Sequence, residues 1–293
     1  MTSWFRVTCA PRAIASLMLV IAVPAFAQRG GPRTPRADSL RDASRLDLDG
    51  STGKAREILA KLVESAPDPA AKADVQRALA MSFAFDGDCT NTVKSEDQVI
   101  AFWATREQAE PQNAFYQEGE MANEAARVCI DAGDFATAEK YYRRGAELGL
   151  KEPEPKTHPA SLWDFRLAHA LARLAARRGD KAEAARQVAA ARKILDGDAA
   201  MAKQQERFFP YLTGYVAFYT GDLKGAEADL TKTIAIPGNA NDPFFHCLLA
   251  MTYEKLGDQA KAREFYQKAY DLATAHNPPA AYVRPLARKK LAR

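Results

Sequence analysis

One recurring dipeptide constrains the fold of this chain more than any other feature. Gly-Asp recurs with successive glycines 46, 46, 42 and 36 residues apart, at Gly87, Gly133, Gly179, Gly221 and Gly257. A glycine can end a helix in the left-handed conformation, and an aspartate directly after it can cap the next helix. The repeat therefore predicts a series of helical hairpins.

Small residues flank these glycines at fixed distances. Seven residues before them lie Ala80, Ala126, Ala172, Gly214 and Ala250, and five residues after them lie Thr92, Ala138, Ala184, Ala226 and Ala262. Two helices approach closely only where the side chains at their crossing are small. The spacing therefore predicts tightly packed antiparallel helix pairs.

One segment, residues 243–278, resembles a tetratricopeptide repeat. The matching positions are Leu249, Ala250, Tyr253, Gly257, Asp258, Ala262, Tyr266 and Ala269. Residues 119–150 resemble the repeat nearly as well, and residues 165–195 and 207–236 less fully. The resemblance implies an all-α, right-handed superhelical solenoid over residues 39–293, with about six helix pairs and a C-terminal capping helix from about Pro279.

Two stretches interrupt the pattern. Residues 89–95 are polar and β-branched, so the second helix of that pair is expected to begin late, near Ser95 or Glu96. Residues 151–159 contain three prolines, which predict an extended connection before a helix that begins near Ala160.

The N-terminus has the composition of a secretory signal. Arg6 and Arg12 precede an apolar run over residues 13–23, and Ala25 and Ala27 are the small residues that a signal peptidase needs. The run is too short to span a bilayer, which takes roughly 20 residues. We therefore predict a signal peptide over residues 1–27, cleavage between Ala27 and Gln28, a disordered leader over residues 28–38, and a periplasmic or secreted chain without a membrane span.

Charge gives little indication of a nucleic-acid partner. The chain has 41 basic and 37 acidic residues, and removing the signal removes two arginines and no acid. The result is near neutral, so no nucleic acid is expected to bind. Basic residues do gather at the C-terminus, at Arg284, Arg288, Lys289, Lys290 and Arg293. We interpret them as part of a solvated capping helix, with a site for anionic lipid or polymer as the alternative.

No enzyme motif is found, and neither a cofactor nor a metal is expected. Residues 50–54 are similar to a phosphate-binding loop, but Leu48 replaces its first glycine and Ala55 its hydroxyl residue. The histidines lack metal-ligand spacing, because the one close cysteine, Cys247, is adjacent to His246 and diverges from it on a helix. An enzyme would need residues that converge across repeats.

The resemblance also implies that the first helix of each pair lines a concave groove. The candidate peptide-binding residues are Asn123, Arg127, Arg166, His169, Arg173, Arg177, Tyr211, Tyr215 and Tyr219. Guanidinium groups pair well with carboxylates, and tyrosines offer ring area with a polar end. The alternative is that the arginines are solvated and the aromatic rings pack in the interior.

These features predict a binding scaffold rather than an enzyme. The expected ligand is an extended, acidic segment of a peptide or protein partner, held in the groove. The alternative is a structural subunit of a cell-envelope assembly that uses its edges or its capping helix.

Three cysteines remain after cleavage, namely Cys89, Cys129 and Cys247. An oxidising compartment allows one disulfide among them. Cys89 follows one hairpin turn and Cys129 precedes the next, so both are expected near the same edge of adjacent hairpins. We therefore predict a Cys89–Cys129 disulfide, with Cys247 buried and reduced.

Overall fold

The structure, a computed structural model, describes residues 34–292. All regular secondary structure in this range is helical. The helices are α1 (Pro35–Asp49), α2 (Thr52–Glu64), α3 (Pro69–Phe85), α4 (Cys89–Ala104), α5 (Pro111–Ala132), α6 (Phe135–Leu150), α7 (Ala160–Arg177) and α8 (Lys181–Gly197). They continue with α9 (Ala199–Gln205), a 3-10 helix η1 (Glu206–Phe208), α10 (Phe209–Thr220), α11 (Leu223–Ala235), α12 (Pro243–Leu256), α13 (Gln259–Leu272) and α14 (Pro278–Leu291).

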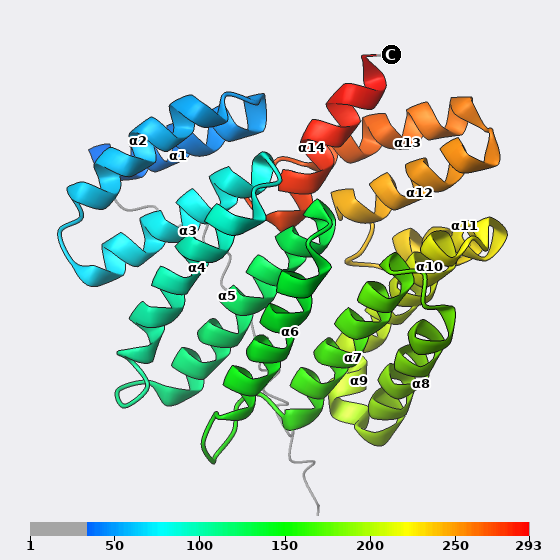
Figure 1. Cartoon of the computed structure of the whole chain (residues 1–293), viewed down its shortest axis with the longest axis horizontal. Coiled ribbons are helices and arrows are strands. Elements are labelled where there is room, and N and C mark those ends of the chain that lie inside the picture. Colours follow the sequence, from blue (N-terminus) through cyan, green and yellow to red (C-terminus); the bar gives the residue numbers. More distant parts are fainter. Residues whose placement is uncertain (1–33, 293) are drawn as a thin grey trace, which may run out of the picture. The chain divides into compact units, whose positions relative to one another are not determined.

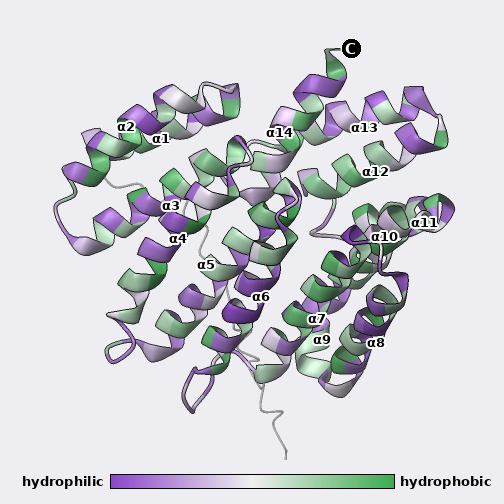
Figure 2. Ribbon diagram, viewed as in Figure 1, coloured by the Kyte–Doolittle hydropathy of each residue, from purple (hydrophilic) through white to green (hydrophobic). Residues whose placement is uncertain are grey.

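The helices pack as consecutive pairs (Figure 1). Within residues 34–292 these pairs are α1–α2, α3–α4, α5–α6, α7–α8, α10–α11 and α12–α13, and each pair packs against the next. Hydrophobic and hydrophilic residues alternate along most helices in Figure 2, as expected when one face is in the core and another in solvent. The prediction of a helical-repeat solenoid with six pairs and a terminal helix is confirmed.

The Gly-Asp turns have the predicted conformation. All five glycines have positive φ, between 69° at Gly87 and 95° at Gly221. Each following aspartate accepts a hydrogen bond from the backbone N–H three residues later, as Asp134 does from Thr137 at 3.0 Å. The small residues on both sides of these turns are buried at the helix crossings. Local sequence thus determines where each hairpin turns and how closely its helices approach.

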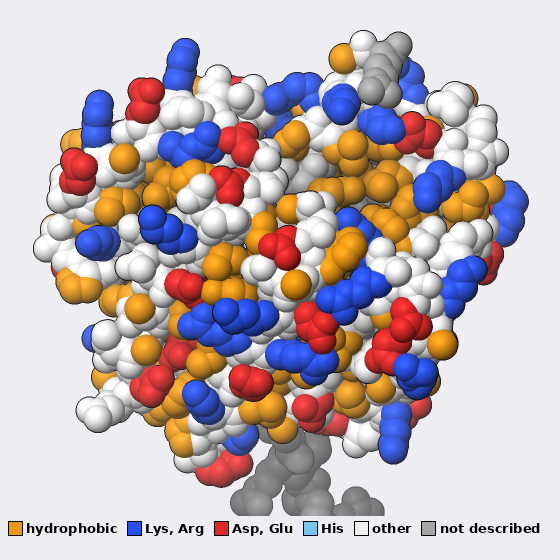
Figure 3. Space-filling model, viewed as in Figure 1, with side chains coloured by type: hydrophobic (Ala, Val, Ile, Leu, Met, Phe, Trp, Pro, Cys, Tyr) orange, Lys and Arg blue, Asp and Glu red, His pale blue; other side chains and the backbone are white. Residues whose placement is uncertain are grey.

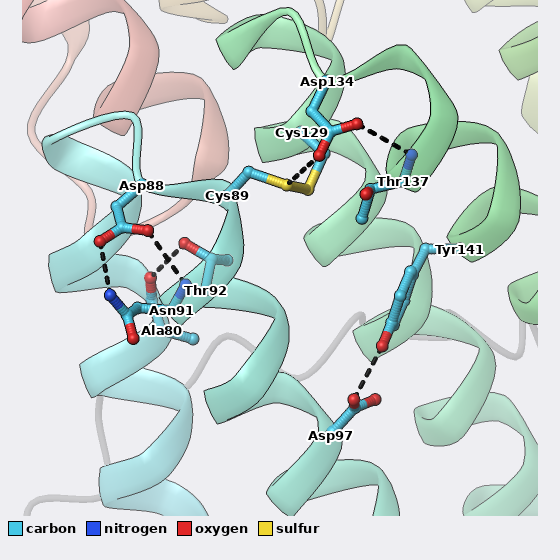
Figure 4. The surroundings of a disulfide bond; sticks show 10 residues. All are labelled: Ala80, Asp88, Cys89, Asn91, Thr92, Asp97, Cys129, Asp134, Thr137 and Tyr141. Atoms are coloured by element: carbon cyan, nitrogen blue, oxygen red, sulfur yellow. Dashed lines mark hydrogen bonds between the residues drawn. A yellow bond between two sulfur atoms is a disulfide. The ribbon is translucent and has the colours of Figure 1, made fainter.

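The two interruptions have different outcomes. Residues 151–159 contain no helix and α7 begins at Ala160, so that prediction is confirmed. The late start of the fourth helix is wrong, because α4 begins at Cys89. The polar residues there serve the turn itself. Asp88 accepts from the Asn91 backbone N–H at 3.0 Å, and the Thr92 hydroxyl donates to the Ala80 carbonyl at 3.3 Å (Figure 4).

A short helical spacer, α9 with η1, separates the fourth pair from the fifth and was not predicted. The signal was present in the sequence as a further Gly-Asp pair, Gly197-Asp198. Here the aspartate caps a new helix without a hairpin turn. Its Oδ1 atom accepts from the backbone N–H groups of Ala200 and Met201, at 3.1 and 3.0 Å.

The terminal helix α14 caps the last pair as predicted, but Arg284, Arg288 and Lys290 are bound within the chain rather than solvated, so that part of the interpretation is wrong. It packs against α13 and α12 and also against α3, α5 and α1 (Figure 1). Two of its basic residues bind the carboxyl end of α1, where the Leu48 carbonyl accepts from Arg284 Nε at 2.5 Å and Arg288 Nη2 at 2.7 Å. Cations are favourable at that end of a helix. The helix therefore links the last repeat to the first.

The predicted signal peptide, residues 1–27, and residues 28–33 of the predicted leader lie outside the described residues. Helix α1 begins at Pro35, so the last four residues of that leader are helical. Between residues 34 and 292, no helix is both long and apolar enough to cross a membrane.

Cys89 and Cys129 are joined by a disulfide between α4 and α5, with their Cα atoms 4.7 Å apart (Figure 4). Cys247 is a free, buried thiol, and burial raises its pKa. The disulfide closes a loop with a sequence separation of 40 and lies beside the Gly-Asp turn that joins α5 to α6.

We predict that peptide mapping of the chain from residue 28, without reduction, will recover Cys89 linked to Cys129 and will label only Cys247. Reduction should lower the free energy of unfolding by roughly 2–4 kcal/mol, because the unfolded chain regains the freedom of the closed loop. The double variant Cys89→Ser/Cys129→Ser is the control and should not respond to reductant. Recovery of free Cys89 and Cys129 thiols would contradict the pairing.

A second prediction concerns the crossing of α5 and α6. A Cβ atom at Gly119 would lie 2.9 Å from the Gly145 carbonyl oxygen and 2.6 Å from the Trp163 ring. Gly119→Ala should therefore destabilise the protein by about 1–3 kcal/mol in urea unfolding. The matched control is Gly53→Ala in the first turn of α2, where a Cβ atom would meet nothing within 4 Å outside its own helix backbone and chain neighbours, so this change should not destabilise the protein. Equal effects of the two substitutions would show that the close approach does not matter.

Candidate functional site

A cavity of about 410 Å³ lies among α5, α7, α10 and α12. These are the first helices of four successive pairs, and the N-terminus of α14 completes the lining with Pro278 and Pro279. The cavity includes most of the predicted peptide-binding residues: Asn123, Arg127, Arg166, His169, Arg173 and Tyr211. The face of each helix was therefore assigned correctly at these positions.

Aromatic rings form much of the wall. Tyr211 lies 4.7 Å from Phe245 and 6.1 Å from Phe244, measured between ring centroids. The Arg127 guanidinium lies over the Phe244 ring at 4.0 Å. Phe165 and Phe208 also line the space. The cavity thus offers apolar surface beside charged groups, as small-molecule and side-chain pockets commonly do.

Some of the charges at the cavity are already compensated. Arg166 forms an ion pair with Glu120, and Arg77 binds Glu124 through two hydrogen bonds of 3.1 and 2.5 Å. Basic and acidic side chains are likewise interspersed on the face shown in Figure 3, without a continuous basic surface. The groove is therefore less cationic than its row of arginines suggests.

Arg173 is different, because no carboxylate pairs with it among the described residues. The residue is only 7% exposed. Its guanidinium donates to the hydroxyls of Tyr211 and Tyr142, each at 3.3 Å, and to the His169 carbonyl at 3.4 Å. These neutral acceptors satisfy donors but do not neutralise the charge. A buried cation without a counter-ion is costly for the folded protein.

Arg127 also has an unused donor. Its Nε atom binds Asp131 at 3.1 Å, but its Nη2 atom is buried without a hydrogen-bond partner in the described part of the chain. Asp131 is shared, since Arg177 Nη1 lies 4.0 Å from its other oxygen. Burial raises the pKa of the nearby Asp242 carboxyl. The Phe244 backbone N–H, which donates to this carboxyl at 2.8 Å, acts in the opposite direction and lowers its pKa.

His169 contributes no positive charge at neutral pH. Burial, and then the neighbouring Arg173 cation, lower the pKa of this histidine well below its usual value, and the Phe208 backbone offsets the shift only in part. The ring is therefore neutral at pH 7.

The other predicted binding residues, Arg177, Tyr215 and Tyr219, do not line this cavity. Arg177 Nη1 lies 3.4 Å from both tyrosine hydroxyls, and Tyr215 is only 1% exposed. Arg177, Tyr215 and Tyr219 therefore belong mainly to the interior. This agrees with the alternative interpretation, in which the aromatic rings pack in the interior. Phe218 is buried beside these residues.

Several lining residues were not predicted. Tyr142 lies on α6, a second helix, and Asp242 is the N-cap of α12. Asn277, Pro278 and Pro279 come from α14, which enters the groove from the end of the chain. A rule based on helix register selects first helices only, so it could find none of these residues. Between residues 34 and 292 there is also no group of three His, Cys, Asp or Glu residues placed to hold a metal ion.

Comparison with known families supports the repeat architecture. The tetratricopeptide repeat model matches residues 245–276, which cover α12 and α13 from Phe245 onward. A search of curated proteins finds no match to the chain. The match covers one helix pair, and the described residues form six successive pairs, so the chain is similar in architecture to tetratricopeptide-repeat proteins.

The shared carboxylate generates a prediction. Asp131→Asn removes the counter-ion of Arg127 and Arg177, so we expect a loss of roughly 3–5 kcal/mol in the free energy of unfolding. The control is Glu183→Gln, because Glu183 pairs with Arg186, whose side chain is 69% exposed. That change should have a much smaller effect, because a solvent-exposed ion pair contributes little to stability. Two equally stable variants would show that Asp131 does not compensate the buried cations.

Proposed function

We propose that this chain is an exported protein-interaction scaffold that binds an acidic segment of a partner at the cavity among α5, α7, α10 and α12. Stacked helix pairs present side chains from several repeats to one ligand, which suits a binding scaffold rather than a catalyst. The observation that carries the proposal is Arg173, a buried guanidinium at the cavity without a carboxylate partner among the described residues.

An acidic ligand supplies what this site lacks. Arginine binds carboxylates through a planar fork of N–H donors, and such charge-assisted bonds are stronger than those to neutral acceptors. Arg173 now relies on tyrosine hydroxyls at 3.3 Å, and Arg127 has a free buried Nη2 atom. A carboxylate in the cavity would give Arg173 the counter-ion that it lacks.

The terminal helix limits the length of the segment. Because α14 packs against α3, α5 and α12, it occupies the adjoining part of the face that the first helices form. The bound part of the partner is therefore the few residues that enter the cavity, rather than the longer extended segment expected from the sequence. Arg284, Arg288 and Lys290 are engaged within the chain, which disfavours the alternative of an envelope subunit that assembles through α14.

Export is supported by the predicted signal peptide and by the Cys89–Cys129 disulfide. Disulfides persist in oxidising compartments such as the periplasm and the extracellular space. We infer that the partner is met there.

The test uses the chain from residue 28 and two fluorescent pools of random decapeptides, one rich in Asp and Glu and the other rich in Lys and Arg. Fluorescence polarisation should show binding of the acidic pool only. Arg173→Gln should weaken that binding at least tenfold, about 1.4 kcal/mol. The matched control is Arg178→Gln, because Arg178 is exposed and pairs with Glu139 away from the cavity. Equal binding of both pools, or no effect of Arg173→Gln, would overturn the proposal.

A further inference from the structure

We propose that the same cavity binds a free small monocarboxylate with an apolar or aromatic body, which would compete with the partner segment. The inference rests on the proposed function only in that both use this cavity. It is carried by the cavity's charge balance, its aromatic wall and its size.

The charge balance favours one negative charge. Arg166 with Glu120 and Arg77 with Glu124 are neutral pairs. Arg127 binds Asp131, which leaves Arg173 as the lining cation that no carboxylate pairs among the described residues. Because Glu120, Glu124 and Asp242 all line the cavity, a second negative charge on the ligand would lie close to carboxylates. A monoanion is therefore preferred to a dianion.

The donors for this anion come from side chains rather than from the start of α14. Pro278 and Pro279 have no N–H group, and the Ala280 N–H already donates to the Asn277 side chain at 3.1 Å. The available donor is the guanidinium of Arg173, whose side-chain acceptors at present are the neutral hydroxyls of Tyr211 and Tyr142. A guanidinium offers a carboxylate a planar fork of N–H donors.

The rest of the cavity suits an apolar body. Phe165, Phe208, Tyr211, Phe244 and Phe245 line it, and a volume of about 410 Å³ is near the lower end of the range for small-molecule sites, roughly 300–1,000 Å³. Phe208 is half-buried, whereas the other four rings are at most 5% exposed. A carboxylate carrying a phenyl ring or a short alkyl chain would fill the cavity and contact Phe208, which an acetate-sized anion would not do.

Calorimetry with three probes, 3-phenylpropionate, cyclohexanecarboxylate and octanoate, tests the inference. At least one should bind the chain from residue 28 saturably, and its uncharged amide should bind at least tenfold more weakly. Phenylsuccinate, a dianion, should bind more weakly than phenylpropionate if that monoanion is bound. Arg173→Gln should weaken binding of the carboxylate at least tenfold, whereas Arg178→Gln should leave it unchanged.

A second variant keeps the test valid if Arg173→Gln does not fold, as judged by circular dichroism. Phe208→Ala removes a half-buried ring from the wall and should weaken the carboxylate severalfold. The inference is overturned if none of the three carboxylates binds at millimolar concentration, if the amide binds equally well, or if folded Arg173→Gln or Phe208→Ala binds as wild type does.

Competition separates this inference from the proposed function. If the cavity is first saturated with the carboxylate that binds, the acidic peptide pool should no longer bind. If the pool binds through Arg173 and no carboxylate does, the scaffold function stands and the small-ligand site fails. If a carboxylate binds and the pool does not, the reverse holds.

Discussion

The fold depends on one local interaction, the left-handed glycine followed by a capping aspartate. At five of the six hairpins the glycine ends the first helix, and the aspartate side chain binds the backbone N–H three residues later. This fixes both helix ends, so the small residues seven positions before and five after the glycine meet at the crossing. At the first hairpin Gly50 is followed by Ser51, which forms no side-chain cap. Because each pair packs mainly on its neighbours, the same local geometry extends along the whole series of pairs.

Local signals also explain which parts of the fold were predictable. The six pairs and the start of α7 follow from glycine, aspartate and proline, which act within a few residues. The position of α14 does not, because Arg284 binds Leu48 across 236 residues and Arg288 binds it across 240. A run of basic residues has the same sequence pattern whether it is solvated or binds a helix end. The early start of α4 was missed because Asp88 and Thr92 stabilise it through specific hydrogen bonds.

The candidate site was predictable to the extent that helix register determines it. Residues four apart share a face, which placed Arg127, Arg173 and Tyr211 at one cavity. Register says nothing about partners in other repeats. Arg166 pairs with Glu120 and Arg77 with Glu124, at separations of 46 and 47 residues, about one repeat. These pairings decide which arginines are neutralised, and they depend on how adjacent repeats are aligned.

The remaining excess of positive charge has a physical implication. A buried guanidinium without a counter-ion destabilises the folded chain, and an apolar residue of similar size would commonly be more stable in its place. The hairpins need only small and apolar residues at their crossings, so the fold itself does not require Arg173. Its hydrogen bonds to Tyr142 and Tyr211 hold the guanidinium beside the cavity and the aromatic wall. A cation that is already held in position lowers the entropic cost of ordering the site when an anion binds. The stability that the fold loses by burying Arg173 is thereby connected to stronger binding of the anion.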